Sequence, residues 1–112
     1  MQSKDKVILK KLIKYCNEIE RILDSIDNDK SRYINEIIYQ LSTDMCVFQL
    51  GELSVHMSEE FKLKHLDIPW AEMRGMRNIH AHEYDNVNRE QMWITLVEDI
   101  PKLKDKLLKI SD

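Results

Sequence analysis

The chain has 112 residues, of which 43% are apolar and 33% are charged. This balance is that of a folded domain with a charged surface, and it excludes an intrinsically disordered chain. The formal net charge is −3, so the chain lacks the overall positive field of many nucleic-acid-binding proteins. Any binding to nucleic acid would therefore need a local cationic site.

The length predicts one domain over residues 1–112, and the composition predicts that this domain is all-α. Only two glycines and two prolines are present, whereas sheets joined by tight turns need more turn-forming residues. An amphipathic helix is predicted over residues 4–26, because apolar residues recur there every three or four positions. The polar residues 27–31 predict a loop that caps the next helix.

A second helix is predicted from about Ile34 towards Leu53, with Gly51 inside it. A glycine within a helix costs about 1 kcal/mol relative to alanine. We therefore expect Gly51 to permit either close helix packing or a bend. A short third helix is predicted over residues 58–65, and a fourth over residues 70–81.

The segment after the fourth helix has no helical period of apolar residues, and it predicts a loop over residues 83–87. The last helix is predicted to begin after Asn88, which stands in a capping-box relation to Gln91, and to run to about Ile110. Pro101 lies inside this helix and predicts a kink, because its ring clashes with an earlier carbonyl group and it has no N–H. Together these elements predict an antiparallel bundle of four to five helices.

The two cysteines are predicted to be small core residues, since Cys16 and Cys46 lie among apolar residues and form no CxxC pair. The polar start of the sequence does not resemble a secretory signal. No apolar stretch approaches the roughly 20 residues that are needed to span a bilayer. We therefore expect a cytoplasmic protein with no membrane segment.

Residues 74–84, which read RGMRNIHAHEY, are the segment richest in functional side chains. Arg77 offers a planar, always-charged guanidinium that suits a phosphodiester oxygen. His82 offers an imidazole that titrates near neutral pH and can accept or donate a proton during attack by a ribose 2′-hydroxyl. Because RNA itself supplies that nucleophile, such a reaction needs no metal ion.

The spacing of Arg77 and His82 sets a condition on a site of this kind. Five residues along a continuous helix correspond to about 140° around its axis, so the two side chains would not share a face. They converge only if the helix ends near His80, or if two subunits share the site.

Other interpretations of this segment remain open. Arginine and histidine near the end of a helix are ordinary, because cations interact favourably with the negative end of the helix dipole. A divalent metal could be bound by His80, His82 and Glu83, although HxH outside a strand is a weak pattern. The sequence has no paired Glu-x-x-His, no glycine-rich oxyanion turn and no phosphate-binding loop, so it favours neither a di-iron bundle, a serine hydrolase nor a P-loop protein.

The spacing Arg77, four residues, His82, one residue, Tyr84 resembles the motif of the HepT-like family of the HEPN superfamily. The similarity covers most of the chain in the right order, which makes the match specific. It extends to residues 68–78 before the motif, to residues 49–52 (QLGE) in the second helix and to residues 99–101 (DIP) in the last helix.

The resemblance implies an all-α bundle of the HEPN type that forms a homodimer, with the two motifs facing one another across a cleft. It implies cleavage of an RNA substrate without a metal or cofactor, with Arg77 and His82 as the catalytic pair. Asn78, Arg74 and His80 would bind RNA or orient the site.

The resemblance also implies a toxin that is paired with a nucleotidyltransferase antitoxin of the MNT type. In part of the family this antitoxin transfers AMP from ATP to the tyrosine of the motif, which is Tyr84 here. Two features near the motif are unexpected for a site that binds RNA. His80 offers a second candidate imidazole, and Glu83 and Asp85 place negative charge beside the proposed RNA site. The alternative interpretation is a non-catalytic helical module that binds and assists the nucleotidyltransferase.

Overall fold

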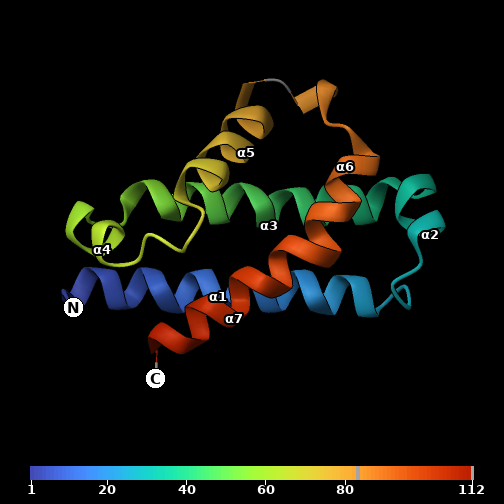
Figure 1. Ribbon diagram of the computed structural model, residues 1–112. Coiled ribbons are helices and arrows are strands. Elements are labelled where there is room, and N and C mark those ends of the chain that lie inside the picture. Colours follow the sequence, from blue (N-terminus) through green and yellow to red (C-terminus); the bar gives the residue numbers. More distant parts are fainter. Residues whose placement is uncertain (83, 112) are drawn as a thin grey trace.

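The protein is all-α, as the sequence predicts. A computed structural model describes the backbone of residues 1–82 and 84–111, and their side chains except those of residues 81, 82 and 84. The α-helices are α1 (Ser3–Asp24), α2 (Lys30–Asn35), α3 (Ile37–His56), α4 (Glu59–Lys64), α5 (Trp70–His82), α6 (Arg89–Ile94) and α7 (Ile100–Ser111) (Figure 1). A 3₁₀ turn, η1 (Tyr84–Asn86), precedes α6, and a π-helical segment, η2 (Thr95–Asp99), joins α6 to α7.

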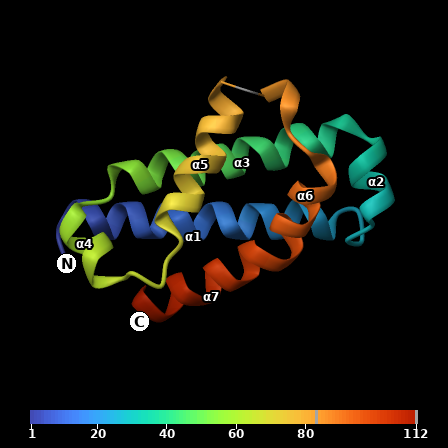
Figure 2. The same ribbon diagram turned by 45° about the horizontal axis from the view of Figure 1, so that its top comes forward.

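The helices form an antiparallel bundle built around α3. The long helices α1 and α3 run side by side in opposite directions, and α7 packs obliquely across α1 (Figures 1 and 2). Helix α5 packs on α3 and rises away from it on the side opposite α1, so α3 lies between them (Figure 2). The C-terminal end of α5, which carries the predicted motif, is therefore remote from most of the core.

The periodic apolar positions of α1 and of α7 form much of the core, whereas those at the start of α3, Ile38, Leu41 and Met45, are exposed. Most buried positions of α1 follow its pattern, namely Ile8, Leu12, Cys16, Ile19 and Leu23, while Asp5 and Leu9 are buried in addition. Cys16 and Cys46 are both buried free thiols, as predicted. Burial raises the pKa of Cys16 to about 12 and that of Cys46 to about 11, so both thiols stay protonated and unreactive at neutral pH.

The predicted second helix is divided in two, which the sequence did not indicate. The chain is extended at Glu36, with φ −119° and ψ 108°, between α2 and α3. Side chains stabilise this break: the Gln40 amide donates to the carbonyls of Tyr33 and Ile34, both at 2.9 Å, and Arg32 pairs with Glu36 at 2.9 Å. The start of α2 follows the prediction, since its cap lies within the polar loop.

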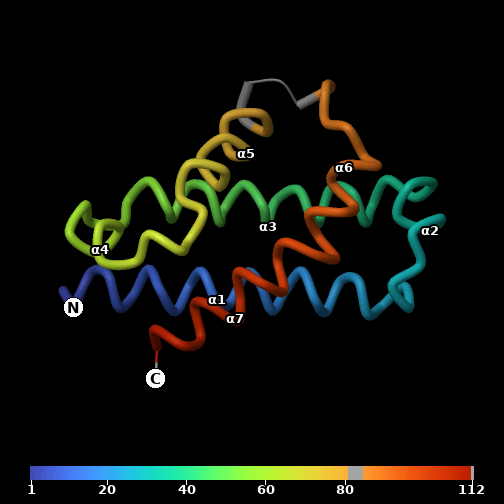
Figure 3. The backbone as a smooth tube through the Cα atoms, in the orientation of Figure 1, coloured from blue at the N-terminus to red at the C-terminus, as the bar shows by residue number. Residues whose placement is uncertain are grey.

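The last predicted helix is made of α6, η2 and α7, which follow one another without an intervening loop (Figure 3). Its helix type changes before Pro101. In η2 the helix widens to π geometry, and the N–H of Ile100 donates to the carbonyl of Thr95, five residues earlier. A π-helical segment therefore lies just ahead of the proline, and the kink at Pro101 itself stays a prediction. The predicted cap is also present, because the Asn88 side chain accepts a hydrogen bond from the N–H of Gln91 at 3.0 Å.

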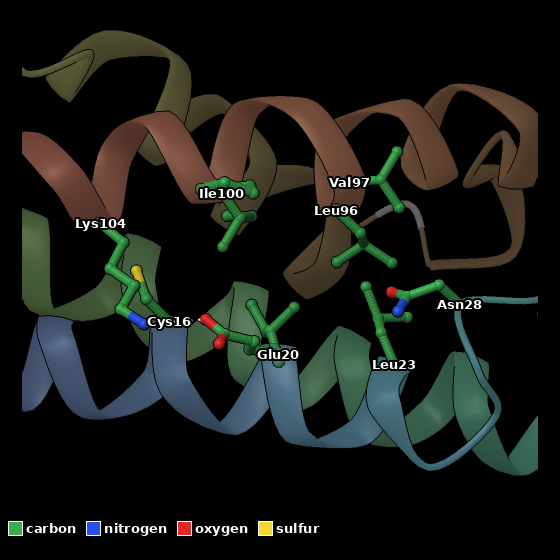
Figure 4. A pocket seen from close by; sticks show the side chains of 10 residues that line it. Cys16, Glu20, Leu23, Asn28, Leu96, Val97, Ile100 and Lys104 are labelled. Carbon is green, nitrogen blue, oxygen red and sulfur yellow. Dashed lines mark hydrogen bonds and ion pairs between the residues drawn. The ribbon is translucent and has the colours of Figure 1, made fainter.

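A pocket of about 240 Å³ lies beside η2, between α1 and the start of α7 (Figure 4). Across it Nζ of Lys104 donates to the Glu20 carboxylate at 2.8 Å. Its described lining includes none of the predicted site residues.

A buried carboxylate at the other end of the bundle fixes α4 to α1. Asp5 accepts hydrogen bonds from the backbone N–H of Ser58 at 3.1 Å and from its hydroxyl at 2.6 Å. Ser58 in turn caps α4 by accepting from the N–H of Phe61 at 3.2 Å. Burial alone would raise the pKa of Asp5, but the hydrogen bonds from Ser58 lower it below its ordinary value.

No helix in the described part of the chain combines the length and the apolar character that a membrane span requires.

Candidate functional site

The site is built where α5 crosses α3, and Gly51 makes that crossing possible. A Cβ atom on Gly51 would overlap the Cβ of Arg77 and would lie 2.7 Å from the carbonyl oxygen of Met73. Of the two roles predicted for this glycine, the structure therefore confirms close helix packing. The contact places Arg77 directly on the backbone of α3.

Arg77 is held from two directions while its side chain keeps access to solvent. Its Nε donates to the Glu52 carboxylate of α3, and NH1 donates to the Asn78 side-chain oxygen at 2.9 Å. The Arg77 side chain is 32% exposed and that of Glu52 is 28% exposed. A guanidinium fixed in this way is oriented in advance for an anionic group arriving from solvent. Arg74 and Asn78 are both exposed on the same helix.

His80 lies one turn beyond Arg77 and also contacts α3, and its side chain is buried, with only 3% exposed. Its Nδ1 lies 2.9 Å from the carbonyl oxygen of Met76, and its Nε2 lies 3.1 Å from Oδ1 of Asp44 on α3. When Asp44 is ionised both partners are acceptors, and a ring that donates from both nitrogens, the imidazolium form, satisfies the two contacts together. Of the two roles predicted for His80, this position supports orientation of the site.

The partner of His80 is itself held by an arginine. Arg89 of α6 forms a two-pronged contact with Asp44, with both nitrogen–oxygen distances 2.7 Å. The same guanidinium donates to the Tyr33 hydroxyl of α2 at 3.1 Å. Burial alone would raise the pKa of Asp44, but the hydrogen bonds from His80 and Arg89 lower it. Asp44, His80, Arg89 and Tyr33 are called the Asp44 cluster below.

The pKa of His80 is raised within the Asp44 cluster. Burial by itself lowers this pKa, but the hydrogen bonds to Asp44 and to the Met76 carbonyl outweigh it. The contribution of protonated His80 to stability is therefore complete below the ordinary histidine pKa of about 6.5 and is lost as the pH rises through the folded-state pKa. Arg89 from α6 faces the same carboxylate and opposes this rise.

Helix α5 continues to His82, two residues past His80, the position near which the helix would end if both side chains converged within one chain. Arg77 and His82 are then about 140° apart around one helix axis. The side chains of His82 and Tyr84, and all of Glu83, lie outside the described residues. Among the residues that are described, no group of three acidic, histidine or cysteine side chains is placed to hold a metal, and both nitrogens of His80 are engaged.

The face of α3 that is turned away from the core is apolar along a three- and four-residue spacing. Ile38, Leu41, Met45 and Val55 on this face are 65%, 48%, 58% and 42% exposed. Glu52, which binds Arg77, falls on the same line between Met45 and Val55. This surface, called the α3 face below, therefore leads directly to the Arg77 site.

Comparison with known families matches residues 12–110 to the family described as Ribonuclease HepT-like. The chain belongs to this family. A protein of Methanocaldococcus jannaschii whose name proposes it as an RNase is 28% identical over 102 residues, which cover 91% of this chain and 92% of that protein. A protein of Thermococcus cleftensis, named as a proposed ribonuclease HepT, is 43% identical over 61 residues, which cover 54% of this chain and 56% of that protein. No solved structure matches the chain significantly.

In this HepT-like protein, sequence reasoning did not identify three of the residues that build the site. Glu52 was visible only as part of the QLGE segment, with no reason to pair it with Arg77. Asp44 carried a weak signal, because a carboxylate there interrupts the apolar spacing of its helix. Arg89 carried none, because a charged residue in the first turn of a helix is ordinary.

Proposed function

We propose that this HepT-like protein is an endoribonuclease that cleaves RNA without a metal ion, through Arg77 and His82. The observation that carries the proposal is the Arg77 guanidinium, which is fixed by Glu52 and Asn78 yet open to solvent. Such a group suits a phosphodiester, because a planar fork of donors matches the non-bridging oxygens. Membership of a ribonuclease family supports RNA as the substrate.

The proposed reaction begins with attack of a ribose 2′-hydroxyl on the adjacent phosphorus. The new bond joins the 2′-oxygen to phosphorus, and the bond from phosphorus to the 5′-oxygen of the next nucleotide breaks. His82 serves the proton transfers, which remove a proton from the 2′-hydroxyl and supply one to the leaving 5′-oxygen. Arg77 stabilises the charge that builds up on the non-bridging oxygens. The products are a 2′,3′-cyclic phosphate and a 5′-hydroxyl.

We propose further that the site is composite and forms in a homodimer. An unbroken α5 separates Arg77 from His82 around its axis, which favours a histidine supplied by the second copy. The α3 face is the surface on which that copy would pack, because Ile38, Leu41 and Met45 are exposed there and clustered exposed apolar residues often mark an interaction site. Its line includes Glu52, so two copies meeting there would bring two Arg77 side chains near one cleft. Pairing would also double the local positive charge of a chain whose net charge is −3.

The proposed reaction predicts cleavage that survives removal of metal ions. Purified protein should cut single-stranded RNA at the same rate with and without EDTA, and mass spectrometry should find 2′,3′-cyclic phosphate ends. An oligonucleotide that carries 2′-O-methyl groups should remain intact, because it lacks the nucleophile. Loss of cleavage on chelation would revive metal binding by His80, His82 and Glu83. A complete lack of cleavage would favour the non-catalytic module that assists a nucleotidyltransferase.

We propose that the protein is a cytoplasmic toxin controlled by an MNT-type nucleotidyltransferase, with Tyr84 as the acceptor of AMP. Tyr84 begins η1, just beyond the end of the helix that carries Arg77 and His82. Transfer would join the Tyr84 oxygen to the α-phosphorus of ATP and release pyrophosphate. The phosphate attached to Tyr84 would then bind the Arg77 guanidinium in place of the phosphate of the RNA substrate.

Co-expression with a nucleotidyltransferase encoded beside this protein should add AMP to Tyr84, and peptide mass spectrometry should locate the modification. Tyr84→Phe should carry no AMP and should remain toxic in the presence of that partner. Tyr15→Phe, which changes a partly exposed tyrosine of α1, should be modified and neutralised like the unaltered protein. Neutralisation with Tyr84 unmodified would show that the partner acts by binding alone.

A further inference from the structure

Arg77 packs on Gly51 and pairs with Glu52 of α3, but beyond Arg77 the described part of α5 has little apolar packing that could hold its direction. Met73 is buried, but among the described residues beyond it no apolar side chain of α5 is fully buried. A hollow of about 210 Å³, lined by residues that include Met76, Ile79 and His80, lies between the C-terminal half of α5 and α6. Apolar packing alone therefore leaves the end of the helix weakly fixed.

The Asp44 cluster supplies the missing attachment. His80 is the last described side chain of α5, and its ring reaches across to Asp44 on α3. Asp44 is bound on its other side by Arg89 of α6, which also reaches Tyr33 of α2. Three helices thus meet at the Asp44 carboxylate, and α2 is joined to it through Arg89. The contact from α5 is made by His80, two residues before His82.

The chemistry of the Asp44 cluster is directional, unlike apolar packing. The two-pronged contact with Arg89 fixes the plane of the carboxylate, and Nε2 of His80 then aligns with one oxygen of that plane. Nδ1 is tied at the same time to the Met76 carbonyl one turn earlier. The contact within α5 orients the ring, and the contact between Nε2 and Asp44 ties the last turn of α5 to α3.

We infer that His80, Asp44 and Arg89 are positioning residues, which fix the direction of the end of α5 so that His82 is presented correctly to Arg77 of the second copy. This inference rests on the proposed function for its catalytic consequence. None of the three touches RNA in this assignment, because His80 and Asp44 are buried. Misplacement of a catalytic group by about 1 Å can reduce a rate by about 100-fold.

The test compares Asp44→Asn with Asp5→Asn. Each change removes one buried carboxylate charge, but Asp5 fixes α4 at the other end of the bundle. Asp44→Asn should reduce kcat by at least about tenfold with a smaller change in KM, at a temperature where both variants are folded. Asp5→Asn should leave kcat unchanged even if it lowers the melting temperature by as much as Asp44→Asn does. Equal losses in both variants, or none in Asp44→Asn, would overturn the inference.

A second pair of variants covers the case in which Asp44→Asn does not fold, because it leaves Arg89 without its carboxylate. His80→Gln keeps a donor for Asp44, whereas His80→Leu fills a similar volume without one. We expect His80→Gln to retain several-fold more activity than His80→Leu. A cluster that only fills space would give the opposite order, because leucine is the better apolar filler.

Hydrogen exchange gives a readout that does not need RNA cleavage. In His80→Leu the amides of residues 78–82 should exchange at least about tenfold faster, while those in the middle of α1 stay unchanged. Nitrogen-15 spectra should show both ring nitrogens of His80 protonated at neutral pH, with His80→Leu identifying the signals. If the unaltered protein cleaves no RNA, the proposed function fails while these measurements still test the attachment of α5. Unchanged exchange in His80→Leu would overturn it.

Discussion

Arg77→Ala and His82→Ala should each reduce RNA cleavage by about 100-fold or more while leaving the helical bundle folded. Loss of a preorganised donor to the developing charge costs about 10²–10³ in rate, and loss of a general acid or base costs about 10²–10⁴. Arg77→Ala leaves Glu52 without its partner, but this carboxylate is 28% exposed and can be hydrated. Initial cleavage rates and circular dichroism melting curves measure the two effects separately.

A matched control is available on α1, where Arg21 is 77% exposed and pairs with Glu18 in the same helix. Arg21→Ala removes the same charge from the surface, and it should leave the cleavage rate unchanged. A similar loss of rate in Arg21→Ala would mean that net charge matters and that the Arg77 site does not.

Mixing the two inactive variants tests the composite site directly. If Arg77 of one copy works with His82 of the other, a mixed dimer holds one intact site and one site that lacks both residues. Random mixing should then restore about a quarter of the full activity, since half of the dimers are mixed and each has one site of two. If each site lies within one chain, mixing restores nothing.

Light scattering should show a dimer for each protein, and Met45→Lys on the α3 face should give monomers.

In α3 the three- and four-residue spacing marks exposed residues, among them Ile38, Leu41 and Met45, so the sequence predicted this helix but not its buried face. The sequence predicted α1 well because this helix buries a continuous apolar stripe. Its pattern of three- and four-residue spacing reports directly on the core, as the buried positions of α1 show. The break at Glu36 escaped prediction because neither glycine nor proline marks it. It is stabilised by Gln40 and Arg32, whose side chains would fit a continuous helix equally well.

The site was predictable only in part, for a related reason. Arg77 was identified through a local motif, and the short distance along the chain from Arg77 to His82 allowed its geometry to be examined in advance. The contact between Asp44 and His80 spans 36 residues and that between Asp44 and Arg89 spans 45. No local spacing encodes such pairs, because they depend on how α3, α5 and α6 cross. The same holds for Glu52 and Arg77.

Gly51→Ala should destabilise the protein by about 1–3 kcal/mol, the usual cost of overpacking a core. The new Cβ would overlap the Cβ of Arg77 and meet the Met73 carbonyl oxygen at 2.7 Å. These atoms belong to, or are bonded directly to, the backbone of α5, so the helix itself must move. For a chain of this size the melting temperature should fall by several degrees for each kcal/mol. Cleavage should fall as well, because Arg77 would move away from Glu52.

Gly75→Ala is the matched control, since it makes the same change in a helix only two residues from Arg77. A Cβ on Gly75 would meet nothing within 4 Å, and alanine is favoured over glycine in a helix by about 0.5–1 kcal/mol. This variant should therefore melt at a higher temperature than the unaltered protein. The opposite signs follow from one cause, because the helical preference of alanine acts at both positions and only the α3–α5 crossing opposes it. Equal stabilisation by both substitutions would mean that α3 and α5 are not in close contact at Gly51.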